Sequence, residues 1–265
     1  MIDLDHSFST FYYMPRNVIL PVVDPDDTHR IKKDALSDLP MRVPIIGPSD
    51  LSGKTTFIIN CLMRPYNKHD KEGRHFYRND FKSENIYIIC GSGEGDKKWT
   101  ALIEGREIPD GNVYDHYDED ELRDLLDMLK EDHLVRVEEG EPIEHTLIIL
   151  DDCAFTGDLK SKRNGFISEV FCNARHHFVS IILTAQDYTQ ISTTARRNAT
   201  MIVAFQSDEP SRELMAKDFS FTCSKKDVMK MYLDCTRDPH SFFLVNKTNP
   251  ADRRYMNCEL QPVHP

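Results

Sequence analysis

The sequence has 265 residues, of which 40% are hydrophobic, and a formal net charge of -11. A chain of this length and composition is sufficient for one large α/β domain with a substantial core. The acidic balance excludes a protein that binds nucleic acid through a basic surface over its whole extent, so any such contact has to come from a local patch.

Cysteine usage and the absence of apolar stretches of membrane-spanning length indicate the cellular compartment. The seven cysteines are scattered, odd in number and without a C-x-x-C pair. This pattern indicates neither a disulfide framework nor a zinc site, and it favours small apolar side chains in a reducing environment. The N-terminus has no basic region followed by an apolar run, and no apolar stretch is long enough to span a bilayer. We therefore expect a soluble, intracellular protein with no membrane-spanning segment.

Residues 1–40 are expected to form an N-terminal arm rather than a separate domain. Short apolar runs in this region are interrupted by Pro15, Pro21 and Pro25, and a polar stretch follows them. Such an arm could pack on the core or on a neighbouring subunit.

From residue 41 the sequence alternates short apolar runs with helical stretches, which is the pattern of parallel strands joined by crossover helices. Strands are predicted at 43–46, 86–90, 147–150, 179–183, 201–205 and 242–245. Their continuous Ile, Val and Leu content is typical of strands covered on both faces. We predict an α/β domain over residues 41–250, with a mostly parallel sheet flanked by helices, and a polar C-terminal tail at 251–265.

The first predicted strand ends in a loop of small residues, which is followed by a lysine and two threonines. The backbone N–H groups of such a loop, and the dipole of the helix after it, favour phosphate groups. Lys54 would reach the β- and γ-phosphates of a nucleoside triphosphate, and the Thr55 hydroxyl would bind Mg²⁺. The predicted phosphate-binding residues are Gly47, Pro48, Ser49, Asp50, Leu51, Ser52, Gly53, Lys54, Thr55 and Thr56.

The spacing of this loop departs from the usual pattern by one residue. Four residues normally separate the first glycine from the Gly-Lys pair, whereas five lie between Gly47 and Gly53. Either Gly47 serves with a one-residue bulge, or Pro48 takes the first position. The alternative to a nucleotide site is an ordinary strand, turn and helix in which the Gly-Lys-Thr sequence is coincidental.

A very acidic segment lies between the second and third predicted strands, at residues 114–129. Four leucines at helical spacing predict an amphipathic surface helix, namely Leu122, Leu125, Leu126 and Leu129. The alternative is an acidic metal site.

The glycines at 91–95 lack the G-x-G-x-x-G spacing of a dinucleotide site, and no helix clearly opens on them. We interpret this stretch as a flexible loop that leads to Trp99. A tryptophan beside two lysines either packs in the core or stacks on a base.

Polar residues follow the predicted strands at 147–150 and 179–183. Asp151 would hold Mg²⁺ directly or through water, and Asp152 would orient or deprotonate the attacking water. Gln186, at the end of the next strand, can hydrogen-bond the γ-phosphate or the water. Arg196 and Arg197 could supply charge in the transition state, in cis or to a neighbouring subunit, or belong to a solvated helix end.

This combination of a Gly-Lys-Thr loop, two strand-end carboxylates, a strand-end glutamine and an arginine pair resembles the FtsK/HerA superfamily of motor ATPases. It is most similar to the genome-packaging ATPases of double-stranded DNA viruses, including large eukaryotic viruses and virophages. The resemblance covers residues 41–205. It implies an additional-strand P-loop core with ATP and Mg²⁺, assembled as a pentameric or hexameric ring, that pumps double-stranded DNA into a preformed capsid. A capsid or portal-vertex protein is the further partner implied.

The resemblance also implies roles for individual residues. Lys54 and Thr55 bind phosphate and Mg²⁺, Asp151 is the metal carboxylate, Asp152 is the catalytic carboxylate, and Gln186 is the sensor. One of the two arginines is the arginine finger. Many members of the superfamily carry Glu at the catalytic position, and the shorter Asp reduces the reach to water.

Two other functions remain open from the sequence: a P-loop nucleotide kinase or other NTPase that does not act on DNA, and a nonhydrolytic ATP-binding subunit. A kinase would need an arginine-rich lid segment, which the sequence does not show. If DNA is bound, the most concentrated basic stretch is residues 160–163. A protein of this kind is expected to act inside the host cell, in a cytoplasmic virus factory or the nucleus, or with the virion.

Overall fold

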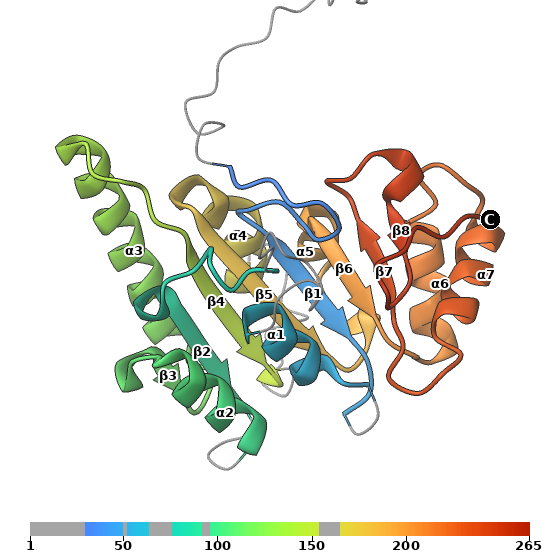
Figure 1. Ribbon diagram of the computed structural model, residues 1–265, viewed down its shortest axis with the longest axis horizontal. Coiled ribbons are helices and arrows are strands. Elements are labelled where there is room, and N and C mark those ends of the chain that lie inside the picture. The colour runs from blue at the N-terminus through green and yellow to red at the C-terminus, as the bar shows by residue number, and fades with distance from the viewer. Residues whose placement is uncertain (1–29, 50–51, 64–75, 92–95, 154–164) are drawn as a thin grey trace, which may run out of the picture.

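A twisted sheet with helices on both faces forms the centre of the molecule (Figure 1). The computed structural model describes residues 30–49, 52–63, 76–91, 96–153 and 165–265. The strands in these segments are β1 (Arg42–Ile46), β2 (Ile86–Cys90), β3 (Val113–Tyr114), β4 (Thr146–Asp151), β5 (Val179–Ala185), β6 (Met201–Ala204), β7 (Phe243–Asn246) and β8 (Tyr255–Met256). The α-helices are α1 (Lys54–Met63), α2 (Lys97–Arg106), α3 (Glu119–Glu139), α4 (Phe166–Asn173), α5 (Thr193–Asn198), α6 (Glu209–Asp218) and α7 (Lys225–Cys235).

The strands follow the spatial order β3-β2-β4-β5-β1-β6-β7-β8. Pairing is parallel from β3 to β6, and β7 and β8 join antiparallel at one edge. Ile182 of β5 is paired with Val43 of β1 on one side and with Ile149 of β4 on the other. The mostly parallel α/β sheet is therefore confirmed, and β5 is the additional strand between the loop strand and the carboxylate strand.

Two apolar layers cover the two faces of the sheet. Helices α1 and α2 pack on one face through Ile58 and Leu102, and the segment before β1 adds Leu36 to the same layer. Helices α3 to α7 contribute to the layer on the other face. Strands β1, β2, β4 and β5 are buried along their whole length, as expected for continuous Ile and Val runs covered on both sides.

Helix α3 is the predicted acidic surface helix. The carboxylate of Asp118 caps its first turn by accepting from the N–H groups of Asp120 and Glu121, at 2.8 and 3.1 Å. The helix ends at Gly140, whose φ of 69° lies in the left-handed region. Three of the four leucines are buried and the fourth packs against them, which confirms the amphipathic face: Leu122, Leu125, Leu126 and Leu129.

Several elements were missing from the sequence-based expectation, namely β3, β8, α2 and α4. The expectation that no helix opens after residues 91–95 was wrong, because α2 begins at Lys97 and is capped by Asp96, whose carboxylate accepts from the Lys98 N–H at 2.8 Å. Strands β3 and β8 have two residues each, too short for a periodic signal. Strand β8 extends the sheet within the expected C-terminal tail.

Some predicted features lie outside the described residues, including most of the N-terminal arm and the basic stretch at 160–163. Within the described segments, residues 31–39 bridge back on themselves and bury Ala35, Leu36 and Leu39. No helix of these segments combines the length and the apolar character that a bilayer crossing requires.

Candidate functional site

The loop after β1 requires glycine at position 47. A Cβ on Gly47 would lie 2.6 Å from the Ser52 Cβ and 2.8 Å from the Phe205 Cβ, so the loop and the residue after β6 approach position 47 too closely for any side chain. Gly53, the last residue before α1, has a φ of +90°. The steric need for glycine thus falls on Gly47 and not on Pro48, and the loop carries its extra residue between these two glycines.

The Lys54 side chain lies across the mouth of this loop. Its ammonium group donates to the carbonyl oxygens of Gly47 and Pro48 at 2.6 and 2.9 Å. The Ser52 hydroxyl closes the loop with a 2.7 Å hydrogen bond to the Pro48 carbonyl. Lys54 is only 8% exposed. The loop therefore holds a buried cation beside the N-terminus of α1, where the helix dipole also favours anions.

Two loop residues of the predicted set lie outside the described residues, namely Asp50 and Leu51. Ser49 is described, in the turn before them, and Thr56 lies in the first turn of α1.

The carboxylate of Asp151, at the end of β4, is buried and accepts three hydrogen bonds. Thr184 on the neighbouring β5 donates to Oδ1 at 2.7 Å. Trp99 Nε1 and the Thr55 hydroxyl donate to Oδ2 at 2.9 and 3.2 Å. The Asp151 carboxylate and the Thr55 hydroxyl thus lie side by side, and both are hard oxygen donors of the kind that Mg²⁺ prefers.

Trp99 is a site residue that sequence reasoning missed. Its spacing favoured a packed residue on a loop, and the side chain is indeed buried, at 5% exposure. Its indole N–H, however, is directed at Asp151 from helix α2, which comes from a different part of the chain. The two lysines that precede it were the one sequence signal for a function, and that signal suggested stacking on a base instead.

Asp152 adopts a backbone conformation that is uncommon for its residue type, with a φ of 53°. Its N–H donates to the Thr184 hydroxyl at 2.9 Å, so one hydroxyl orients both consecutive aspartates. Gln186 Nε2 lies 3.5 Å from Asp152 Oδ1. A Cβ on Gly91 would lie 2.6 Å from the Asp152 carbonyl, so this turn also packs tightly against the end of β2.

A cavity of about 520 Å³ opens beside the loop. Its lining includes Pro48, Ser52 and Gln186 as well as Phe205 and the 237–241 loop. Its size suits a small organic ligand. Because the carboxyl ends of parallel strands meet at this edge, it is also where ligands bind in open α/β sheets.

The two predicted arginines are not brought to this site. Arg196 donates to Asp218 at 2.8 Å, and its guanidinium lies 5.0 Å from the centre of the Tyr188 ring. Arg197 is exposed.

The position of these arginines follows from the backbone around them. Lys247 Nζ donates to the carbonyl of Arg196 at 3.0 Å, and the Lys247 N–H donates to the Thr200 carbonyl. The Thr200 N–H in turn donates to the carbonyl of Arg42, the first residue of β1. Both arginines therefore lie toward the amino-terminal edge of the sheet, while Gly47 lies at the carboxyl edge. A strand rises about 3.3 Å per residue, so the length of β1 separates them from the loop of their own subunit.

Comparisons with known proteins show which family and which solved structures this chain resembles. A protein-family model described as Poxvirus A32 protein matches residues 109–247. No curated protein sequence gives a significant match.

Solved structures share the fold at low sequence identity. The genome packaging NTPase B204 from Sulfolobus turreted icosahedral virus 2, in complex with ATP-gammaS, is 16% identical with a TM-score of 0.51, covering 84% of this chain and 98% of that chain. B204 from Sulfolobus Turreted Icosahedral Virus, described as a DNA-packaging ATPase, is 15% identical with a TM-score of 0.50, covering 85% and 99%. The pCW3 conjugation coupling protein TcpA, a monomer with ATPgS, is 12% identical with a TM-score of 0.51, covering 80% and 58%.

These likenesses confirm the P-loop ATPase fold predicted from the sequence. They also agree with the predicted resemblance to viral genome-packaging ATPases. Since the family model matches more than half of the sequence, the chain belongs to the Poxvirus A32 protein family.

Proposed function

We propose that this protein is an ATP-hydrolysing motor that moves double-stranded DNA into a viral capsid. The observation that carries the proposal is the convergence of Lys54, Asp151 and Asp152 at one edge of the sheet, where the Thr184 hydroxyl joins the Asp151 carboxylate to the Asp152 backbone N–H. Family membership and a fold shared with a genome packaging NTPase support it.

The loop is arranged to bind the phosphates. The Lys54 ammonium, now satisfied by the Gly47 and Pro48 carbonyls, would turn to the β- and γ-phosphate oxygens. The N–H groups at the start of α1 would accommodate the remaining charge. The cavity of about 520 Å³ beside Phe205 would receive the nucleoside.

Residues that fit Mg²⁺ lie next to this loop. The Thr55 hydroxyl and the Asp151 carboxylate, 3.2 Å apart, would hold it. When bound, this ion neutralises charge on the β- and γ-phosphates. Trp99 and Thr184 hold the Asp151 carboxylate in a single orientation, which is the contribution of the protein itself.

Asp152 is suited to act on the attacking water. Its backbone is held by Thr184 in a strained conformation, and Gln186 lies at 3.5 Å from its carboxylate. The carboxylate would accept the proton of a water that the Gln186 amide helps to orient.

The arginine finger is assigned to Arg197, acting on the nucleotide of a neighbouring subunit in a ring. Arg196 is already engaged with Asp218 and Tyr188. Arg197 is exposed at the amino-terminal edge, from which it does not reach its own loop. A pentameric or hexameric ring, a capsid or portal-vertex partner and action inside the infected cell complete the proposal.

The test is ATP turnover with and without double-stranded DNA. Wild-type protein is expected to be stimulated by DNA, and Lys54→Ala and Asp152→Asn are expected to lose turnover by several powers of ten. Phosphoryl transfer to a nucleotide without any effect of DNA would refute the motor. Unchanged turnover in Asp152→Asn would refute its role as the base.

Mixing subunits tests the finger separately. Inactive Arg197→Ala and inactive Asp152→Asn proteins should regain turnover when mixed, because mixed rings contain interfaces with one intact loop and one intact arginine. Arg196→Ala mixtures serve as the comparison. No recovery at any ratio would count against action between subunits.

A further inference from the structure

A second cavity, of about 330 Å³, lies at the opposite edge of the sheet from the nucleotide site. Its lining includes Arg42 at the start of β1, Phe178 just before β5 and Thr200 just before β6, which locates the cavity at the amino ends of these strands. The charged and titratable residues that line it are Arg30, Lys32, Asp38, Arg42, Arg175 and His176. Nothing in the proposed ATPase mechanism uses these residues.

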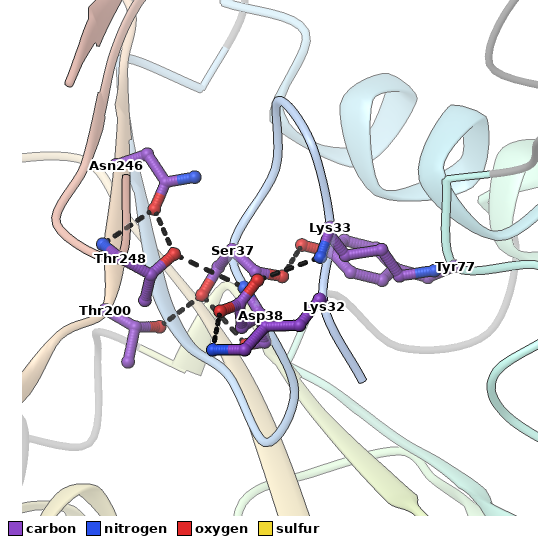
Figure 2. A network of polar contacts seen from close by, with 8 residues as sticks. All are labelled: Lys32, Lys33, Ser37, Asp38, Tyr77, Thr200, Asn246 and Thr248. Carbon is purple, nitrogen blue, oxygen red and sulfur yellow. Dashed lines mark hydrogen bonds and ion pairs between the residues drawn. The ribbon is translucent and has the colours of Figure 1, made fainter. Parts of the chain in front are cut away.

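The lining is strongly basic although the protein carries a net charge of -11. Four Arg and Lys side chains face a single carboxylate, that of Asp38. This carboxylate is already engaged, because it accepts from Lys32 Nζ at 2.9 Å and from the Lys33 N–H at 2.8 Å (Figure 2). With Asp38 paired to Lys32, the described lining offers no further carboxylate to Arg42 or Arg175.

One wall of the cavity is held in place by a polar network. The Ser37 hydroxyl donates to the Thr200 hydroxyl at 2.8 Å, and the Asp38 N–H lies 3.4 Å from the Thr248 hydroxyl (Figure 2). The Thr248 hydroxyl donates to the Asn246 side chain at 2.7 Å. The segment before β1 is thus tied to β7 and to the start of β6, which gives the cavity a preformed wall.

Arg42 is the residue that points to a ligand. It is only 9% exposed, and its Nε is buried with no hydrogen-bond partner in the described structure. Burial, together with the neighbouring guanidinium of Arg175, lowers the pKa of Arg42 to about 10. A buried guanidinium without an anion is costly, and an anion in the cavity would remove that cost.

We propose that this cavity is a phosphate-binding site in which the guanidinium groups of Arg42 and Arg175 hold the anion. A guanidinium presents its N–H donors in a fork that matches two oxygens of a phosphate group. Phosphate suits this lining better than a carboxylate does, because a tetrahedral dianion accepts from several cations that surround it. The phosphate group comes either from a free or nucleotide phosphate or from the backbone of DNA.

The binding test uses inorganic phosphate and the full chain with Lys54→Ala, which disables the loop at the other edge. Calorimetric titration at constant ionic strength should show saturable binding. Arg175→Ala should weaken the affinity about tenfold or more, as expected for a lost charge-assisted contact. Arg175 is exposed, and within the described segments its side chain makes only a long 3.4 Å hydrogen bond, to His176, so this variant should fold, which circular dichroism verifies.

Two further variants keep the test decisive. Arg253→Ala removes another exposed arginine, one paired with Asp34 on the surface, and should leave phosphate binding unchanged. Arg42→Lys keeps the charge but loses the fork, and should also weaken binding. Absence of saturable binding, or an equal loss in Arg253→Ala, would overturn the proposal.

A DNA arm identifies the source of the phosphate. If the group belongs to DNA, Arg175→Ala should lower the affinity for a short duplex and reduce the slope of log affinity against log salt by about 0.9. Unchanged DNA binding together with lost inorganic phosphate binding would assign a free or nucleotide phosphate. Because the background lacks Lys54, neither result depends on ATP hydrolysis.

Discussion

The indole of Trp99 makes the most specific prediction about the nucleotide site. Trp99→Phe keeps an aromatic ring in the core but removes the N–H that donates to Asp151 Oδ2 at 2.9 Å. The carboxylate keeps its bonds from Thr184 and Thr55. A hydrogen bond to a charged group is worth about 1.5–3 kcal/mol, so the carboxylate should lose that much of its orientation energy.

The expected result is a weaker metal site in a folded protein. Loss of a residue that orients a metal ligand typically costs about 10–100-fold in metal affinity or activity, which equals about 1.4–2.8 kcal/mol. The half-saturating Mg²⁺ concentration for ATP turnover should therefore rise by about 10–100-fold in Trp99→Phe. Turnover is measured against Mg²⁺ at fixed ATP, and urea unfolding reports stability alongside.

The matched control removes a buried hydrogen bond that does not involve Asp151. The Tyr77 hydroxyl donates to the Ser37 carbonyl at 2.8 Å, and Tyr77→Phe should cost about 1 kcal/mol of unfolding free energy while leaving the Mg²⁺ dependence unchanged. If Trp99→Phe is folded and its Mg²⁺ dependence stays within twofold of wild type, Trp99 only fills space and the reasoning fails.

Three further predictions follow from the contacts of single residues. Gly47→Ala should lower the melting temperature and abolish ATP binding in a calorimetric titration, because the new Cβ meets two Cβ atoms at 2.6 and 2.8 Å. The control Gly111→Ala, whose new Cβ meets no atom within 4 Å, should change neither quantity. Arg196→Ala should reduce the free energy of unfolding by about 1–2 kcal/mol, because it loses an ion pair and a contact with the Tyr188 ring. Arg197→Ala should reduce it by less than about 0.5 kcal/mol. Equal losses in urea titrations would refute the assignment of a structural role to Arg196 and of the finger to Arg197. Cys153 should resist iodoacetamide at pH 8 in the native protein, because burial and the nearby Asp151 carboxylate raise the pKa of its thiol to about 12. Mass spectrometry measures the alkylation. Rapid alkylation of Cys153 would contradict its burial.

The site could be predicted from the sequence where its signals are local. The predicted strands agree with β1, β2, β4, β5, β6 and β7 to within a residue or two at most ends, because continuous apolar runs bounded by polar residues report burial on both faces. The Lys54 loop and the two aspartates stand directly at strand ends, so their neighbours in sequence reveal them. Once parallel pairing is assumed, they must share one edge of the sheet.

The kind of fold and the residues at the strand ends can thus be read from short stretches of chain, because both are encoded locally. Which distant groups meet depends on the folded arrangement. It joined Trp99 of α2 to Asp151, separated the ion-paired, partly buried Arg196 from the exposed Arg197, and set Arg42 beside Arg175 in an acidic protein. Such contacts depend on the order of the strands and on the paths of the helices between them, which no local pattern contains.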